Sequence, residues 1–105
     1  MAEYNDGVFV RYEFFLTEAG VERFTSWLEE ALRAFQMADG FVDIKRLTAV
    51  DDPQRCLMQA RFATEKGIWR WAMSPEHIRL LESLDGYHVR PWRTETFKVS
   101  SVSAS

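Results

Sequence analysis

Hydrophobic residues recur along this chain with two periods that alternate. Between Val8 and Leu16 they occupy both faces of a stretch with the two-residue period of a β-strand. From Val21 to Phe35 they recur at the spacing of one helix face. Four strands are predicted, at Val8–Leu16, Phe41–Val50, Arg55–Ala63 and His88–Val99, with helices beginning at Thr17 and Thr64. The apolar stripe predicted for the first helix consists of Val21, Phe24, Leu28, Ala31, Leu32 and Phe35.

The two halves of the chain repeat the same start and stop signals. Thr17–Gly20 and Thr64–Gly67 each place a threonine, a favourable N-cap, and a glutamate at the start of a helix. Asp39–Phe41 and Asp85–Tyr87 each end a helix with aspartate, glycine and an aromatic residue. The second helix is expected to stop and restart at Ser74–Pro75, because serine caps helices and proline is tolerated in their first turn.

The predicted order is therefore β-α-β-β-α-β, which is typical of a ferredoxin-like split βαβ fold of the α+β class. Its two helical segments cover one face of a four-stranded antiparallel sheet. The first strand carries aromatic residues on both faces, including Phe14 on one and Phe15 on the other. A second copy of the chain is therefore expected to cover the free face, giving a homodimer.

Length, charge and cysteine content narrow the class of protein. The 105 residues suffice for one domain, predicted at 8–99, between a lead at 1–7 and a disordered tail at 100–105. The net charge is −3 and no basic run is present, which disfavours a nucleic-acid partner. No stretch is apolar enough to predict a membrane span or a signal peptide. The single cysteine, Cys56, excludes an intrachain disulfide, and a cytoplasmic location is expected.

The segment Thr64–His77, TEKGIWRWAMSPEH, resembles the second-helix signature of the antibiotic biosynthesis monooxygenase family. Asp39–Phe41 is similar to the glycine-aromatic exit of the first helix in that family. The resemblance extends over Val8–Val99 and implies a dimeric α+β barrel. It also implies one of several activities, since members include cofactor-free monooxygenases that form quinols or quinones, haem-degrading enzymes and proteins with no assigned reaction.

The haem-degrading branch is disfavoured by the position of the histidine. Relatives of that branch carry an axial histidine about ten residues after the helix tryptophan, and haem iron needs such a ligand. Leu81 stands ten positions after Trp71 and Arg79 ten after Trp69, whereas His77 follows Trp71 by only six. The asparagine that these enzymes place inside the first strand is also missing there. No metal and no cofactor are therefore expected.

The cofactor-free branch requires an apolar pocket, a proton acceptor and a donor that stabilises a phenolate, because a deprotonated quinol can itself reduce dioxygen. His77 and Tyr12 are the candidates for moving protons, and Arg61 or Arg11 for holding the oxyanion. The pocket is expected between the helices and the sheet, and its candidate walls are Trp71, Trp69, Phe24, Phe14 and Met58.

Each candidate also has a purely structural interpretation. Trp71 is equivalent to Phe24 in the repeat, which indicates a core position. His77 fits a solvated or capping role, Tyr12 a packed aromatic, and Arg61 an ion pair. Three functions stay open: a cofactor-independent monooxygenase acting on an aromatic or quinol-like molecule, a non-redox cyclase or isomerase of the same barrel, and a small-molecule-binding dimer without catalysis.

Overall fold

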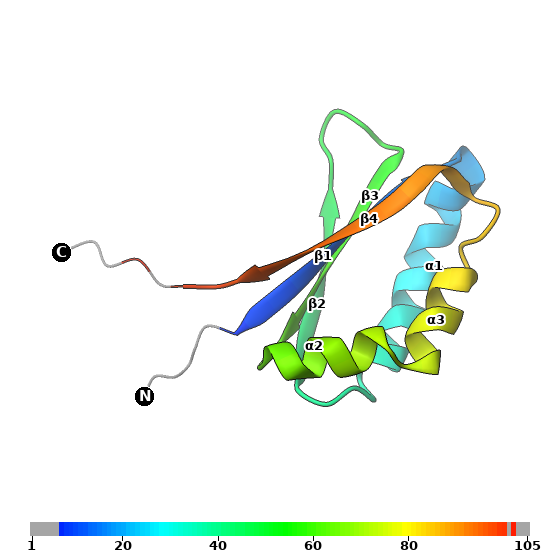
Figure 1. Ribbon diagram of the computed structural model, residues 1–105. Coiled ribbons are helices and arrows are strands. Elements are labelled where there is room, and N and C mark those ends of the chain that lie inside the picture. Colours follow the sequence, from blue (N-terminus) through cyan, green and yellow to red (C-terminus); the bar gives the residue numbers. More distant parts are fainter. Residues whose placement is uncertain (1–6, 101, 103–105) are drawn as a thin grey trace.

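The computed structural model describes residues 7–100 and 102 of the chain, so most of the predicted lead and tail lies outside the described residues. The elements run in the predicted order, with the second helix divided in two at Ser74 (Figure 1). The second strand ends two residues earlier than predicted, because the chain turns between Ala49 and Arg55. In this turn the Asp52 side chain accepts a hydrogen bond from the backbone N–H of Gln54, and the Asp52 carbonyl oxygen accepts one from that of Arg55. In chain order the elements are β1 (Val8–Leu16), α1 (Glu18–Phe35), β2 (Phe41–Thr48), β3 (Arg55–Phe62), α2 (Glu65–Ala72), α3 (Pro75–Glu82) and β4 (His88–Lys98).

The four strands form one antiparallel sheet in the order β2-β3-β1-β4, which confirms the predicted split βαβ topology. The three helical segments lie on the same side of this sheet (Figure 1). β1 is central, and its register with β3 places Tyr12 opposite Met58 and Phe14 opposite Cys56. A register shift after Glu13 interrupts the pairing of β1 with β4.

The core lies between the sheet and the helices, as the alternation along β1 predicts. Alternate β1 residues from Val8 to Leu16 are buried, and α1 contributes Phe24, Ala31 and Phe35. The predicted stripe of α1 was wrong at two positions. Leu32 is 39% exposed, while Trp27, which the stripe omitted, is completely buried and donates its indole N–H to the Leu80 carbonyl oxygen at 2.9 Å.

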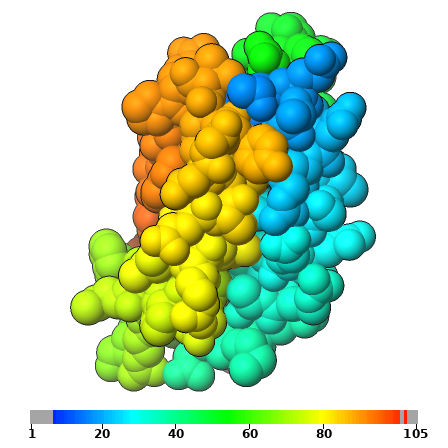
Figure 2. Space-filling view, turned by 90° about the vertical axis from the view of Figure 1, so that its right-hand side faces the viewer, coloured from blue at the N-terminus to red at the C-terminus, as the bar shows by residue number. Residues whose placement is uncertain are grey.

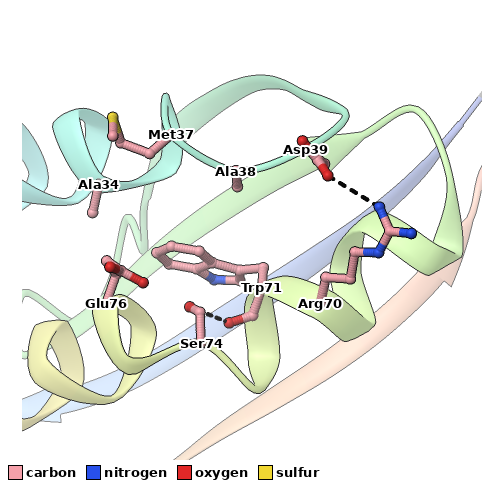
Figure 3. Close-up of a pocket in the computed structure, with 8 residues that line it drawn as sticks. All are labelled: Ala34, Met37, Ala38, Asp39, Arg70, Trp71, Ser74 and Glu76. Carbon is pink, nitrogen blue, oxygen red and sulfur yellow. Dashed lines mark hydrogen bonds and ion pairs between the residues drawn. The ribbon is translucent and has the colours of Figure 1, made fainter.

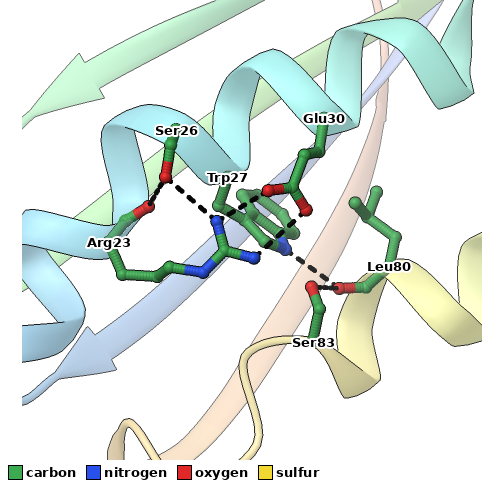
Figure 4. Close-up of polar contacts among 6 residues, drawn as sticks. All are labelled: Arg23, Ser26, Trp27, Glu30, Leu80 and Ser83. Atoms are coloured by element: carbon green, nitrogen blue, oxygen red, sulfur yellow. Dashed lines mark hydrogen bonds and ion pairs between the residues drawn. The ribbon is translucent and has the colours of Figure 1, made fainter.

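This indole hydrogen bond connects α1 to α3, which lie side by side on the outside of the molecule (Figures 2 and 4). On the same helix as Trp27, Arg23 forms two hydrogen bonds with the Glu30 carboxylate, at 2.8 and 3.1 Å. Ser83 also donates to the Leu80 carbonyl oxygen, at 2.6 Å. The packing of α3 on α1 is therefore fixed by a buried bond from a tryptophan rather than by charge.

The repeated helix starts have the same geometry in both halves. Thr17 accepts the backbone N–H of Gly20 at 3.1 Å, and Thr64 accepts that of Gly67 at 3.2 Å. A side chain at either glycine would collide with a neighbour, since a Cβ would lie 2.9 Å from the Leu16 Cβ in one case and 2.7 Å from the Asp39 carbonyl oxygen in the other. The glycine of each repeat therefore permits close approach of the helix, to the end of β1 in the first half and to the connection between α1 and β2 in the second.

No helix among the described residues has both the length and the apolar character needed to cross a membrane.

Candidate functional site

Three elements bring Tyr12, Trp71 and His77 into one hydrogen-bonded cluster, here called the trio. The Tyr12 hydroxyl on β1 lies 3.0 Å from Nε2 of His77 on α3, and it accepts the indole N–H of Trp71 on α2 at 3.1 Å. Tyr12 and Trp71 are buried, with 2% and 3% of their surface exposed, while His77 is half-buried. The structure thus joins two predicted catalytic residues and the first predicted pocket residue.

The break between α2 and α3 is what aims Trp71 and His77 at the same hydroxyl. Ser74 caps α3 by accepting the His77 backbone N–H at 3.2 Å, and it donates its own hydroxyl to the Trp71 carbonyl oxygen at 2.7 Å. Pro75 stands in the first turn of α3, where its missing N–H has no helical partner to lose. Trp71, near the end of α2, and His77, in the first turn of α3, therefore converge on one point of β1.

The direction of the proton donors in the trio follows from the second nitrogen of His77. Nδ1 lies 3.2 Å from the carbonyl oxygen of Ala72, which can only accept, so Nδ1 carries the hydrogen. Nε2 of the neutral ring then has a free lone pair and accepts the Tyr12 hydroxyl hydrogen. Burial lowers the pKa of His77, although the hydrogen bond to Ala72 opposes this effect, so the neutral ring is favoured at neutral pH.

Tyr12 is a neutral hydrogen-bond donor at physiological pH. Burial raises its pKa to about 12, while the hydrogen bond from Trp71 acts in the opposite direction. A buried phenol held between an N–H donor and an unprotonated imidazole can accept a proton on its oxygen while it passes its own proton on. Within the trio, Tyr12 and His77 thus form an uncharged acid–base pair, and Trp71 helps to fix the orientation of the Tyr12 hydroxyl.

Phe35 completes the surroundings of the trio and was not among the predicted site residues. Its ring lies 4.2 Å from the Trp71 ring between centroids, and the His77 ring lies 5.2 Å from Trp71 on the same basis. Phe35 was already the last member of the apolar stripe predicted for α1. Its place in that stripe predicted that Phe35 is buried. It could not predict contact with α2, because that contact depends on the angle between two helices.

A cleft of about 200 Å³ opens beside Trp71, between the end of α1 and the corner where α2 meets α3 (Figure 3). The Trp71 indole lies along it, and an ion pair between Arg70 and Asp39, at 3.0 Å, stands at one side. The predicted site differs here, since the pocket was expected between helices and sheet. The residues that line the cleft are Ala34, Met37, Ala38, Asp39, Arg70, Trp71, Ser74 and Glu76.

The other predicted pocket residues do not face this cleft. Phe14, Phe24 and Met58 have no exposed surface, because Phe14 and Phe24 pack around the Trp27 ring and Met58 lies opposite Tyr12 within the sheet. Trp69 is 60% exposed, since it lies on α2 two residues before Trp71 and points away from the core. Phe14, Phe24 and Met58 are therefore core residues.

The structure places both candidate oxyanion holders on the opposite face of the sheet from Tyr12. Arg61 is exposed and stands opposite Phe9 in the register of β1 with β3. Arg11 forms an ion pair with Glu95 at 3.1 Å on the same face. Neither guanidinium can reach the Tyr12 hydroxyl within one chain. Among the described residues, no three His, Cys, Asp or Glu side chains are grouped so that they could hold a metal ion.

The fold identifies a class of proteins with a similar three-dimensional structure. The chain has the fold of the antibiotic biosynthesis monooxygenases, as the resemblance of its second helical segment implied. No family model matches the chain, and no curated protein matches its sequence. The similarity is therefore one of three-dimensional structure.

Three solved structures illustrate this similarity. SnoaB, a cofactor-independent oxygenase from Streptomyces nogalater, superimposes with a TM-score of 0.78 at 18% identity, over 96% of this chain and 100% of SnoaB. A conserved protein from Methanosarcina mazei Go1 has a TM-score of 0.79 at 10% identity, over 90% and 94% of the two chains. A candidate antibiotic biosynthesis monooxygenase from Deinococcus radiodurans has a TM-score of 0.78 at 10% identity, over 93% and 97%. At these identities the comparisons establish the fold.

Proposed function

We propose that this protein is a cofactor-independent monooxygenase that oxidises an electron-rich phenol or quinol. The observation that carries the proposal is the oriented trio, in which a neutral histidine accepts the hydroxyl hydrogen of a buried tyrosine beside a tryptophan-lined cleft. Its fold is that of SnoaB, a cofactor-independent oxygenase. The substrate class follows from the chemistry that such a site can support without an added redox group.

The proposed reaction balances without an external reductant. A phenol with a free ring position plus dioxygen gives a quinone plus water. Loss of the phenol proton raises the electron density of the ring, and the phenolate then transfers one electron to dioxygen. The resulting superoxide combines with the ring carbon of the phenoxyl radical to give a peroxide, and loss of water leaves the new carbonyl group. The protein has to supply the first proton transfer and a sheltered, apolar environment.

In this proposal Tyr12 relays the proton to His77. The substrate hydroxyl passes its proton to the Tyr12 oxygen while Tyr12 passes its own to Nε2 of His77, so the tyrosine is neutral before and after the step. Tyr12 then donates its hydroxyl hydrogen to the phenolate and stabilises it. The Tyr12 oxygen is covered in this structure, so a substrate entering from the cleft has to displace the Trp71 ring.

Oxygen consumption with a panel of quinols of one to three fused rings tests the proposal. The wild-type protein, treated with a chelator, should consume dioxygen, and the label of ¹⁸O₂ should enter the product. Tyr12→Phe and His77→Gln should each reduce the rate by about 10²-fold or more, the usual contribution of a positioned acid or base. Arg33→Gln, exposed on α1 and outside both the cleft and the open face of the sheet, is the matched control and should keep the wild-type rate.

Two other outcomes would replace the proposal with one of the remaining functions. Substrate turnover without oxygen consumption, lost in Tyr12→Phe, would identify a cyclase or isomerase that uses the same trio. A ligand that raises the melting temperature while no member of the panel is converted would identify a binding protein. The cytoplasmic location expected from the sequence stays a prediction.

We also propose that the uncovered face of the sheet is the interface of a homodimer. Phe9 and Phe15 are only half-buried there, and the Phe9 ring packs on Phe97 of β4 with centroids 5.1 Å apart. A second copy would cover these rings. Sedimentation equilibrium should show a dimer for the wild type and a monomer for Phe9→Glu. Trp69→Glu, on the exposed side of α2, should stay dimeric, and a monomeric wild type would refute this interface.

A further inference from the structure

The trio has a second chemical capacity that acid–base catalysis does not use. A phenol that loses an electron becomes a very strong acid, so its oxidation is easy only where a base can take the proton at the same time. Tyr12 has such a base at 3.0 Å, in the unprotonated Nε2 of His77. The same oxygen also accepts a hydrogen bond from an indole, which is itself oxidisable.

Of the two oxidisable side chains in the trio, Trp71 lines the cleft and Tyr12 does not, although both are buried. The Trp71 indole lies along the cleft, so a reactive molecule there contacts it directly (Figure 3). Tyr12 is 2% exposed and is not among the residues that line the cleft. If Trp71 loses an electron, Tyr12 is therefore adjacent in the interior and can replace it. The distance from Nε1 of Trp71 to the Tyr12 hydroxyl oxygen is 3.1 Å.

We propose that Trp71 and Tyr12 form a redox relay that discharges one-electron oxidants of the peroxyl-radical class in the cleft, with His77 as the proton acceptor. In the first step Trp71 gives one electron to the oxidant, which becomes its anion, and Trp71 becomes a radical cation. In the second step Tyr12 gives an electron to Trp71 and its proton to Nε2 of His77. The products are restored Trp71, a neutral Tyr12 radical and protonated His77.

The relay goes beyond the proposed oxygenation, because any such oxidant that enters the cleft can start it. It also protects the neighbourhood of the cleft. Met37, which lines the cleft, is 82% exposed, and an exposed thioether is readily oxidised to the sulfoxide. Transfer of the radical to the buried Tyr12 moves it away from Met37 and from molecules outside the protein.

Flash photolysis with a ruthenium(III) tris-bipyridine oxidant tests the relay without substrate and without dioxygen. The wild type should form a tyrosyl radical, seen by its optical absorption and by electron paramagnetic resonance, after a shorter-lived tryptophanyl radical. Tyr12→Phe should abolish the tyrosyl signal and prolong the tryptophanyl signal. A tyrosyl signal that persists in Tyr12→Phe would place the radical on another of the three tyrosines and overturn the proposal.

Two further variants separate the relay from a structural role. His77→Gln should lower the tyrosyl yield about tenfold and abolish the solvent deuterium isotope effect on its formation, and His77→Asn serves if the first variant does not fold. Trp71→Phe should slow tyrosyl formation, whereas Trp69→Phe, two residues away and exposed, should not. Equal yields in wild type and His77→Gln would refute the role of His77. Because no quinol or dioxygen is present, failure of the proposed oxygenation leaves these results unaffected.

Discussion

Tyr12 and Glu13 are adjacent on β1, yet each is the centre of a different polar cluster on opposite faces of the sheet. Tyr12 faces the helices and binds only uncharged groups, the Trp71 indole and the His77 ring. Glu13 faces the other way. One of its carboxylate oxygens accepts a hydrogen bond from Nε–H of Arg55, and the other accepts one from Nε–H of Arg93 at 2.9 Å. Both residues are buried, with 2% and 8% of their surface exposed.

The comparison shows that the partners, and not burial alone, decide the charge of a covered group. Burial raises the pKa of both residues in the first place. For Tyr12 the hydrogen bond from Trp71 only partly opposes burial, and the pKa rises to about 12. For Glu13 the hydrogen bonds and charges of Arg55 and Arg93 outweigh burial, and the pKa is lowered. The helix side thus keeps a neutral, proton-moving group, while the open side keeps a fixed charge.

The largest expected effect on stability comes from the indole of the neutral cluster. Trp71→Ala removes a buried aromatic that packs on Phe35, and should lower the free energy of unfolding by about 3–5 kcal/mol. Trp69→Ala is the control on the same helix, and should cost less than about 1 kcal/mol because Trp69 is exposed. Urea denaturation measures both. Equal losses in the two variants would contradict the buried role of Trp71.

Removal of the Tyr12 hydroxyl should have the next largest effect. Tyr12→Phe leaves the Trp71 N–H and the His77 lone pair without this partner, and should cost about 1–3 kcal/mol, the usual penalty for an unsatisfied buried group. Ser26→Ala, which removes an exposed hydroxyl bonded to Arg23, should cost less than about 0.5 kcal/mol. Denaturation curves that superimpose for Tyr12→Phe and wild type would show that the trio contributes nothing to stability.

The charged cluster should respond to both mutation and acid. Glu13→Gln should cost about 1–2 kcal/mol at pH 7, a reduced figure because the Arg93 side chain is largely exposed. Since the folded pKa of Glu13 lies below the unfolded value of about 4.3, this stabilisation is present above about pH 4.3 and is lost as pH falls through the folded pKa. Urea denaturation at pH 7 and pH 3 should therefore show the difference shrinking. Glu95→Gln, which breaks an exposed pair, is the control.

The smallest effect should be a pH dependence that originates in His77. Its folded pKa is lowered by burial, so below about pH 6.5 the unfolded chain binds more protons than the folded one and stability falls. One proton can contribute at most about 1.4 kcal/mol per pH unit. Thermal melting between pH 7.5 and 5 should fall less steeply for His77→Gln than for the wild type. Parallel melting profiles would mean that His77 binds its proton as readily in the folded chain as in the unfolded one.

The strand period alone could have separated some of the predicted site residues. Met58 and Arg61 are three residues apart on one strand, and Arg11 is adjacent to Tyr12, so each pair has to lie on opposite faces. Neither arginine could share a site with the Tyr12 side of the sheet in one chain. Trp27 was also detectable, because it stands three residues after Phe24 on the helix face that the stripe already defined.

What the sequence alone determined is the set of features that depend on neighbours a few residues apart. The alternation along β1, the threonine caps with their glycines, and the break at Ser74 are local, since each is decided by backbone period or by a hydrogen bond spanning three residues. From these signals the order of elements and the fold follow.

Only the tertiary structure decided which side chains form the site. The hydrogen bonds of the trio join residues separated by 59 and 65 positions, so they depend on how α2 and α3 pack against β1. The cleft likewise depends on the distance between the end of α1 and the α2–α3 corner. Packing angles between helices and sheet arise from all the core contacts together, and no short stretch of sequence contains them.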